Sequence, residues 1–377
     1  MAPQTILDSH IHLWPHSAAN SNSHGWMKPG EHLTRQYSIE DYLIATSTAI
    51  SEHSTSTESN EYDLKGFIYV ETDRMVQKTT SDDVHIWAAE PLREIAFLRR
   101  MVEGTPEDGE SGFDSSQANL LKGIVAWAPL DRGIAGFQQY LAAAKEVAGA
   151  KAWRKIRGCR FLLQGIRDKV QFEQLAQGQE FVDLLKLLGE EGWSFDVGID
   201  QRSGGIWQLF SFAEVIEKVH DGVGDRDQTV FILNHLCKPD MKQIPGTEEY
   251  TDIFWHWKTA MSSFAACDNV YIKLSGAFSE MVNQNPDTGG EPLPVSKIVE
   301  ITRPWIKHIV FDCFGPKRIM FGSDWPVCNV QGPSDQLTWA RWKEVVAILL
   351  EDFGLSSEDK DRIWYGTAVE AYRLEGL

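Results

Sequence analysis

Short apolar runs alternate with amphipathic stretches along this chain, and that alternation restricts its fold more than any other feature. Eight runs have the length and the β-branched and aromatic content of strands. The strands predicted in this way are 5–13, 65–71, 121–129, 156–163, 193–198, 229–235, 269–275 and 319–324. Helical spacing of apolar residues follows at 83–102, 136–150, 179–189, 207–219, 254–266, 298–314 and 337–353. Alternating strands and helices are typical of a parallel sheet.

A closed barrel is the arrangement that best accommodates eight such units. The 377 residues would fit two ordinary domains or one α/β barrel with insertions. No linker divides the chain, and no GxGxxG turn follows an early strand, as it would in an open sheet that binds a dinucleotide. We therefore predict an α/β fold, a single (β/α)8 TIM barrel over residues 1–377.

The first βα connection is predicted to be long, because the segment 15–60 is polar. A serine followed by two acids, beginning at Ser38, predicts the start of a helix within it. The run 51–60 is rich in Ser, Thr and Glu and predicts a mobile loop. We expect the loop histidines to be solvated, with the alternative that His24 and Trp26 lie over the site.

Charge and cysteine content restrict the class of partner. A formal net charge of −18 argues against a nucleic-acid or anionic-membrane surface, because phosphates attract an excess of Lys and Arg. The five cysteines are scattered without CxxC spacing, which favours reduced thiols in the cytoplasm. No run approaches the roughly 18 apolar residues of a membrane span, and no signal peptide is expected. We predict a cytoplasmic protein that acts on a small molecule; the oligomeric state stays open.

Polar side chains follow the first and the last predicted strand. His10 and His12 lie two residues apart near the end of strand 5–13, so both can point to the same side with Asp8. Asp324 ends strand 319–324, and closure of a barrel makes these two strands neighbours. Two imidazoles and a carboxylate can hold one divalent ion, with bonds of about 2.0–2.1 Å for zinc. The alternative is that the histidines only satisfy buried polar groups.

Five stretches carry a resemblance to a known family. They are 8–14 (DSHIHLW), 156–160 (IRGCR), 233–239 (LNHLCKP), 270–276 (VYIKLSG) and 321–326 (FGSDWP). In this order they resemble the amidohydrolase superfamily, and more closely its branch of sugar-acid lactonases, which includes rhamnono- and fuconolactonases. The resemblance implies hydrolysis of a small lactone, such as the γ-lactone L-rhamnono-1,4-lactone, on a barrel.

Two departures from the metal-rich members bear on the metal. Those relatives carry a bridging Lys on the fourth strand and a His on the fifth, where this chain has Arg160 and Asp196. A permanently charged guanidinium argues against a two-metal centre. One zinc-like ion on His10, His12 and Asp324, with Glu71 as a further ligand, stays open, because the branch is also similar to enzymes that work without metal.

The resemblance also suggests roles for single residues. Ester hydrolysis needs an activated water and a polarised carbonyl, so Asp324 is the candidate base and His235 the candidate donor. Arg160 is suited to a substrate carboxylate or hydroxyl. Lys273 lies in an apolar strand, where its charge must point to the mouth or be paired. Trp14, Trp26 and Trp325 are candidates to wall the pocket, with ordinary packing as the alternative.

Two other functions are compatible with these residues. Related barrels decarboxylate small acids with one metal, a His and an Asp, and a barrel that only binds a small acid is a third possibility. The binding-only protein has no need of a carboxylate base such as Asp324. Sequence analysis therefore favours the lactonase.

Overall fold

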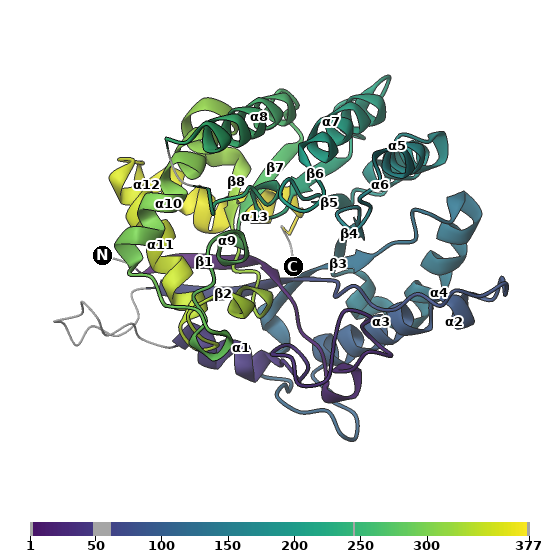
Figure 1. Ribbon diagram of the computed structural model, residues 1–377. Coiled ribbons are helices and arrows are strands. Elements are labelled where there is room, and N and C mark those ends of the chain that lie inside the picture. The colour runs from purple at the N-terminus through teal and green to yellow at the C-terminus, as the bar shows by residue number, and fades with distance from the viewer. Residues whose placement is uncertain (1–2, 48–61, 244–245, 375–377) are drawn as a thin grey trace.

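The computed structural model describes residues 3–47, 62–243 and 246–374, and its centre is a sheet of parallel strands (Figure 1). The strands are β1 (Gln4–Ile11), β2 (Tyr62–Val70), β3 (Leu121–Trp127), β4 (Ile156–Leu162), β5 (Ser194–Gly198), β6 (Val230–Leu233), β7 (Val270–Leu274) and β8 (Ile319–Phe321). They pair in chain order from β1 to β8, and every pair is parallel. All eight strands coincide with predicted ones.

The first and last strands meet and nearly close the barrel. Just beyond β8, Trp325 forms a parallel bridge with Ile11. His12 N donates to Trp325 O at 2.8 Å, and Asp324 N donates to His10 O at 2.9 Å. The predicted (β/α)8 barrel is thereby confirmed, together with the expectation that the two ends of the chain meet at one rim.

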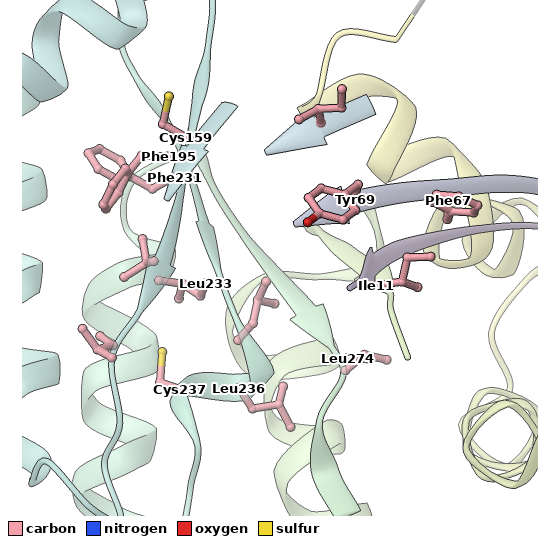
Figure 2. Close-up of a cluster of buried hydrophobic side chains, with 14 of the residues drawn as sticks. Ile11, Phe67, Tyr69, Cys159, Phe195, Phe231, Leu233, Leu236, Cys237 and Leu274 are labelled. Atoms are coloured by element: carbon pink, nitrogen blue, oxygen red, sulfur yellow. The ribbon is translucent and has the colours of Figure 1, made fainter. Parts of the chain in front are cut away.

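Helices cover the outside of the sheet. The long ones are α1 (Ile39–Ser47), α3 (Ala89–Glu103), α4 (Gly133–Trp153), α6 (Gln179–Glu190), α7 (Ile206–His220), α8 (Glu248–Ala265), α10 (Val295–His308) and α11 (Thr338–Asp352). Short ones are α2 (Val84–Trp87), α5 (Lys169–Ala176), α9 (Ala277–Glu280), α12 (Ser357–Asp361) and α13 (Thr367–Ala371). Side chains such as Phe195, Phe231 and Leu233 leave the strands outward and form the buried layer between sheet and helices (Figure 2).

A second buried cluster joins the strands to the C-terminal segment. Leu7, Ile68, Val125 and Ile232 pack with residues of α13 and with Tyr372 after it. Sequence analysis predicted no helix after residue 353, although apolar residues such as Ile363, Trp364 and Val369 lie there. Their burial depends on contacts with distant strands rather than on a regular amphipathic pattern.

The long first connection is described in part. Helix α1 begins at Ile39, directly after the predicted cap Ser38, whose hydroxyl accepts from Asp41 N at 3.3 Å. The predicted mobile run 51–60 lies outside the described residues. Across the described ranges, no helix combines the length and the apolar character that crossing a bilayer requires.

Candidate active site

A cavity of about 260 Å³ opens at the carboxyl ends of the strands. Its lining side chains include Trp14, Trp26, Arg160, His235, Lys238 and Asp324. Arg160 lies in β4 and the others follow β1, β6 and β8, so distant parts of the sequence share one cavity. This end of the barrel is where enzymes with this fold have their active sites.

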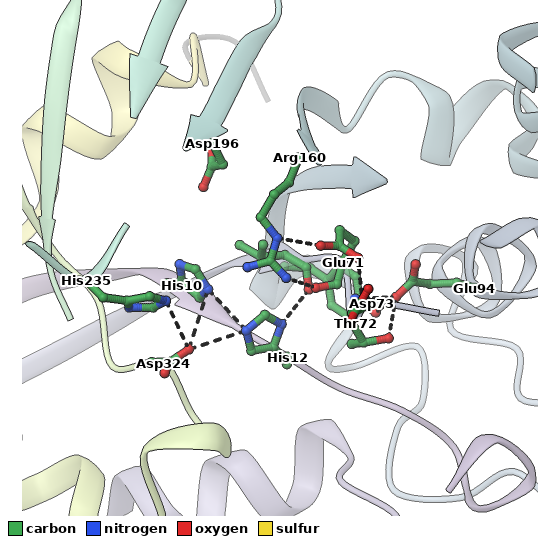
Figure 3. Close-up of polar contacts among 12 residues, drawn as sticks. His10, His12, Glu71, Thr72, Asp73, Glu94, Arg160, Asp196, His235 and Asp324 are labelled. Atoms are coloured by element: carbon green, nitrogen blue, oxygen red, sulfur yellow. Dashed lines mark hydrogen bonds and ion pairs between the residues drawn. The ribbon is translucent and has the colours of Figure 1, made fainter. Parts of the chain in front are cut away.

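Three histidines surround one carboxylate on the cavity wall (Figure 3). Asp324 Oδ1 lies 3.6 Å from His10 Nε2, 3.4 Å from His12 Nε2 and 3.6 Å from His235 Nε2. These separations exceed those of direct hydrogen bonds. The structure thus brings His10 and His12 beside Asp324, as expected from barrel closure, and His235 from the end of β6 joins them.

The chain around Asp324 is held tightly against β1. Asp324 has a left-handed backbone conformation, with φ of 62°. Such a conformation is costly for a residue with a side chain and persists where its surroundings impose it. A Cβ at Gly322 would lie 3.1 Å from Ser9 Oγ and 3.2 Å from His10 Cβ, so a larger residue would require these neighbours to shift. The turn directs the carboxylate into the cavity.

Asp8 does not line the cavity with His12, contrary to prediction, and His10 is fully buried and does not line it either. Its carboxylate accepts from Tyr42 Oη at 3.0 Å, from Trp339 Nε1 at 2.8 Å and from Ser323 N at 2.8 Å. The pairing of β1 with β2 shifts register between Asp8 and Ile11, which breaks the simple two-residue alternation. Asp8 therefore fixes the β8 exit and has no direct part in the cavity.

His235 begins a turn of left-handed backbone. His235, Leu236, Cys237 and Lys238 have φ of 52°, 54°, 58° and 51°. Each such residue costs about 1–2 kcal/mol, and bonds from outside hold the turn: Trp257 Nε1 donates to Leu236 O at 2.8 Å, and Gln201 N to Cys237 O at 3.0 Å. Strain of this kind gathers at functional sites, and here it places the imidazole beside Asp324.

The charge states of the cluster follow from burial and from neighbours. Burial opposes ionisation of Asp324, but His235, His12 and Lys238 outweigh it and hold the pKa of Asp324 below its ordinary value. Burial lowers the pKa of His235 to about 3, although Asp324 works in the other direction. Burial and the nearby Lys273 hold the pKa of His10 well below its ordinary value. The cavity therefore contains an ionised carboxylate beside a neutral imidazole.

Lys273, a predicted substrate contact, is not among the cavity-lining residues. It is fully buried, and its Nζ lies 2.6 Å from Asp196 Oδ2 and 3.1 Å from His10 Nδ1. Tyr372 Oη donates to the two oxygens of Asp196 at 2.9 and 3.0 Å. The charge of Lys273 in an apolar strand needs a partner, and the structure provides Asp196 in the buried interior rather than a ligand at the cavity mouth. The substrate-contact assignment is corrected to a supporting one.

Glu71 is likewise placed away from the three possible ligands. Its carboxylate accepts from Arg160 Nε and from Asp73 N at 2.6 Å, and it is fully buried. Arg160 bonds to the backbone oxygen of Glu71 as well, yet its guanidinium still lines the cavity. The assignment of Glu71 as a metal ligand is corrected, because Arg160 occupies its oxygen (Figure 3).

Two of the three candidate tryptophans line the cavity. Trp14 and Trp26 do so and lie edge to face, with ring centroids 5.8 Å apart. Trp325 is 2% exposed and packs instead on Tyr37 and Tyr42. The loop beside the cavity is anchored by Trp26 Nε1, which donates to Thr72 O at 3.1 Å.

His24 belongs to this ordered part of the loop. It is fully buried, with Nδ1 2.8 Å from Ala18 O and Nε2 2.8 Å from Thr72 Oγ1. The expectation that this histidine is solvated is wrong, and the alternative of a loop beside the site holds. Its burial lowers the pKa of His24 to about 3.

A single divalent ion fits the donor set. Within the described part of the chain, His10, His12 and Asp324 form the group whose ligand atoms lie within 4.8 Å of one another. The three atoms are 3.1, 3.4 and 3.6 Å apart, close to the roughly 3.3 Å between ligands of tetrahedral zinc. His12 Nδ1 lies 2.8 Å from Val70 O, and a carbonyl there leaves Nε2 free to bind.

The contact with Lys273 disfavours His10 as a ligand of such an ion. An ammonium donates to His10 Nδ1 and so places the ring hydrogen of a neutral imidazole on Nε2, which faces the other ligands. Metal-bound histidines usually donate their outer N–H to a carbonyl or carboxylate. An ion would therefore have to displace this hydrogen.

Several lining residues were not identified from the sequence. They are Leu33, Thr72, Asp73, Leu162, Gln164, Gly198, Ile199, Asn234, Lys238 and Val327. Asn234 precedes the predicted donor His235 in the quoted stretch 233–239, so its polar side chain at a strand end was a usable signal. Asp73 and Gln164 lie in loops, and nothing in their local pattern distinguishes them.

Comparisons with known proteins show which family the chain resembles. The family model described as Amidohydrolase matches residues 121–374. An L-rhamnono-gamma-lactonase of Scheffersomyces stipitis is 31% identical over 377 residues, which cover 99% of this chain and 100% of that protein. An L-fucono-1,5-lactonase of Burkholderia multivorans is 26% identical over 215 residues, 56% of this chain and 63% of that protein.

Solved structures share the fold. An amidohydrolase from Burkholderia multivorans with bound HEPES has a TM-score of 0.67 at 22% identity, covering 98% of this chain and 99% of that one. A second crystal form of that protein, with bound zinc, has a TM-score of 0.66 at 22% identity and the same coverage. The family match, the full-length relative and the barrel lead to one conclusion: this chain belongs to the amidohydrolase family.

Proposed function

We propose that this protein hydrolyses a small sugar-acid lactone, such as L-rhamnono-1,4-lactone, to the open hydroxy acid. The observation that carries the proposal is the ionised Asp324 carboxylate, which faces three imidazoles in a cavity of small-molecule size. The full-length relative named L-rhamnono-gamma-lactonase supports the choice of substrate class.

Asp324 serves as the general base. Its pKa lies below the ordinary value, so the carboxylate is ionised at neutral pH and can accept a proton. Because Asp324 lines the cavity, a water in the cavity can donate a hydrogen bond to its carboxylate. Asp324 takes a proton from this water while the water oxygen attacks the carbonyl carbon of the lactone.

His235 stabilises the oxygen that becomes negative. A neutral imidazole carries one N–H, and the hydroxyl of Ser275, 2.9 Å from Nδ1, can donate to that nitrogen and leave the hydrogen on Nε2. Nε2 then donates to the carbonyl oxygen. The positive charges of Lys238 and Arg160 on the same cavity wall favour the developing anion.

The proton held by Asp324 completes the reaction. When the tetrahedral intermediate collapses, the bond between the carbonyl carbon and the ring oxygen breaks, and Asp324 returns its proton to that oxygen. One lactone and one water give one hydroxy acid, and the carboxylate regains its charge. Trp14 and Trp26 provide a flat apolar wall for the ring.

His10, His12 and Asp324 are the residues that would hold a divalent ion, with His12 and Asp324 better suited than His10. Bound there, a zinc-like ion supplies a Lewis acid and a more acidic water. In either case Asp324 transfers the proton and His235 donates its hydrogen bond to the carbonyl oxygen.

Replacement of the base tests the proposal. The Asp324→Asn variant should lose at least about 10²-fold in turnover of L-rhamnono-1,4-lactone while it keeps its fold. Turnover is measured as acid release in weak buffer, together with carbon dioxide and zinc content, so that a decarboxylase is distinguished. Asp352→Asn, an exposed carboxylate paired with Arg303, is the control. Full activity in Asp324→Asn would remove this residue from the mechanism.

A further inference from the structure

Asn234 is a buried polar side chain that the proposed reaction leaves unused. It follows β6, lines the cavity beside His235 and is 2% exposed. Neither Oδ1 nor Nδ2 has a hydrogen-bond partner among the described residues. A buried amide left without partners costs about 1–3 kcal/mol, so this one calls for an explanation.

The backbone of Asn234 leaves its carboxamide free for a ligand. Asn234 N donates to Val197 O at 3.1 Å, and Asn234 O accepts from Cys237 N at 2.8 Å. The residue therefore connects β6 to the left-handed turn through its main chain alone. Because the main chain is fixed on both sides, the side chain is held on the cavity wall next to the proposed oxyanion donor.

A carboxamide presents an acceptor and a donor side by side, in one plane. Its natural partner carries a donor and an acceptor in the same adjacent arrangement. The 2-hydroxyl and the carbonyl of an α-hydroxy lactone have this arrangement, and lactones without a 2-hydroxyl do not. Sugar-acid lactones carry the 2-hydroxyl, because C2 of an aldonic acid keeps its oxygen.

We propose that Asn234 recognises the α-hydroxy-lactone group, Oδ1 accepting from the 2-hydroxyl and Nδ2 donating to the carbonyl oxygen. This inference rests on the proposed function and adds a residue that selects aldonolactones over lactones without that hydroxyl. A site built to bond a substrate hydroxyl rejects the analogue without it by as much as 10⁴–10⁵-fold, because buried polar groups then stay unpaired.

The test compares two substrates in two proteins. L-Rhamnono-1,4-lactone and its 2-deoxy counterpart are assayed with wild type and with Asn234→Leu, which keeps the branched shape of the side chain and removes both polar atoms. We expect a preference of at least 10²-fold in kcat/KM in wild type, and a preference below tenfold in the variant. Asn269→Leu, whose amide donates to Gln228 away from the cavity, should keep the wild-type preference.

A binding measurement keeps the test independent of turnover. In the Asp324→Asn background, calorimetry should show that Asn234→Leu weakens binding of the 2-hydroxy lactone far more than binding of the 2-deoxy lactone. Hydrolysis with an unchanged preference, or equal weakening of both lactones, would overturn the role of Asn234 and leave the lactonase intact. Wild type that hydrolyses neither lactone would overturn both proposals.

Discussion

The buried ion pair below the cavity gives a sharp stability prediction. Lys273 and Asp196 are both fully buried, with Nζ and Oδ2 2.6 Å apart. In Lys273→Met the carboxylate keeps only the hydroxyl of Tyr372 among the side chains described as its partners. A buried charge that loses its counter-charge is poorly compensated, whereas methionine fits the space of the lysine stem.

The expected loss can be worked out from these contacts. Removing one partner of a buried pair costs about 3–5 kcal/mol. A chain of 377 residues has an unfolding entropy of about 0.8 kcal/mol per kelvin. Lys273→Met should therefore lower Tm by about 4–6 °C.

Calorimetric unfolding of five proteins, namely wild type, the two single variants, the double variant and a surface control, tests the predicted coupling. The double variant Asp196→Asn with Lys273→Met should lose less stability than the two single losses combined, by at least about 1 kcal/mol, because no charge is left unpaired. The matched control is Lys297→Met, whose ammonium pairs with Glu300 at the surface and should unfold like wild type. If Lys273→Met unfolds like this control, or if the two single losses are additive, then the pair of Lys273 and Asp196 does not stabilise the fold as its burial implies.

Two further predictions concern the cavity wall and the loop beside it. Gly276→Ala should lower turnover by about 10²-fold, because its Cβ would lie 2.6 Å from His235 Nδ1; Gly354→Ala, with a similar positive φ and no neighbour within 4 Å, should keep full activity at a comparable stability cost. His24 has a folded pKa of about 3, below its unfolded value, so only the unfolded chain gains this proton as pH falls through 6.5, and stability declines. His24→Gln should remove about 2 kcal/mol of the loss between pH 7 and pH 5, and an acid unfolding profile identical to wild type would contradict this.

The parts of the fold that depend on local pattern could be predicted from the sequence. Each strand is a short apolar run, and each long helix on the barrel has an apolar face. The sequence therefore shows both the strand pattern and the helical spacing of apolar residues. The meeting of His10 and Asp324 also followed, because a closed barrel makes its first and last strands neighbours. These inferences need only periodicity and topology.

The rest depends on contacts that no local pattern encodes. The register shift in β1 turned Asp8 away from the cavity, although strict alternation placed it with the histidines. Arg160 and Glu71 were both assigned to outside ligands, yet they pair with each other across the barrel. A charged side chain in a strand indicates that a partner exists, but only the three-dimensional arrangement tells which one.

The hydrogen bond from Tyr372 to Asp196 has a consequence for the order in which the protein is synthesised and folds. The HxH motif precedes this tyrosine by most of the barrel, so during synthesis the support under His10 cannot form until the chain has been extended to Tyr372. Shorter nascent chains contain every predicted catalytic group and still lack the tyrosine that supports Asp196 and Lys273 beside His10. Maturation of the site should accordingly require the segment that contains Tyr372, and a barrel truncated before α13 would be inactive.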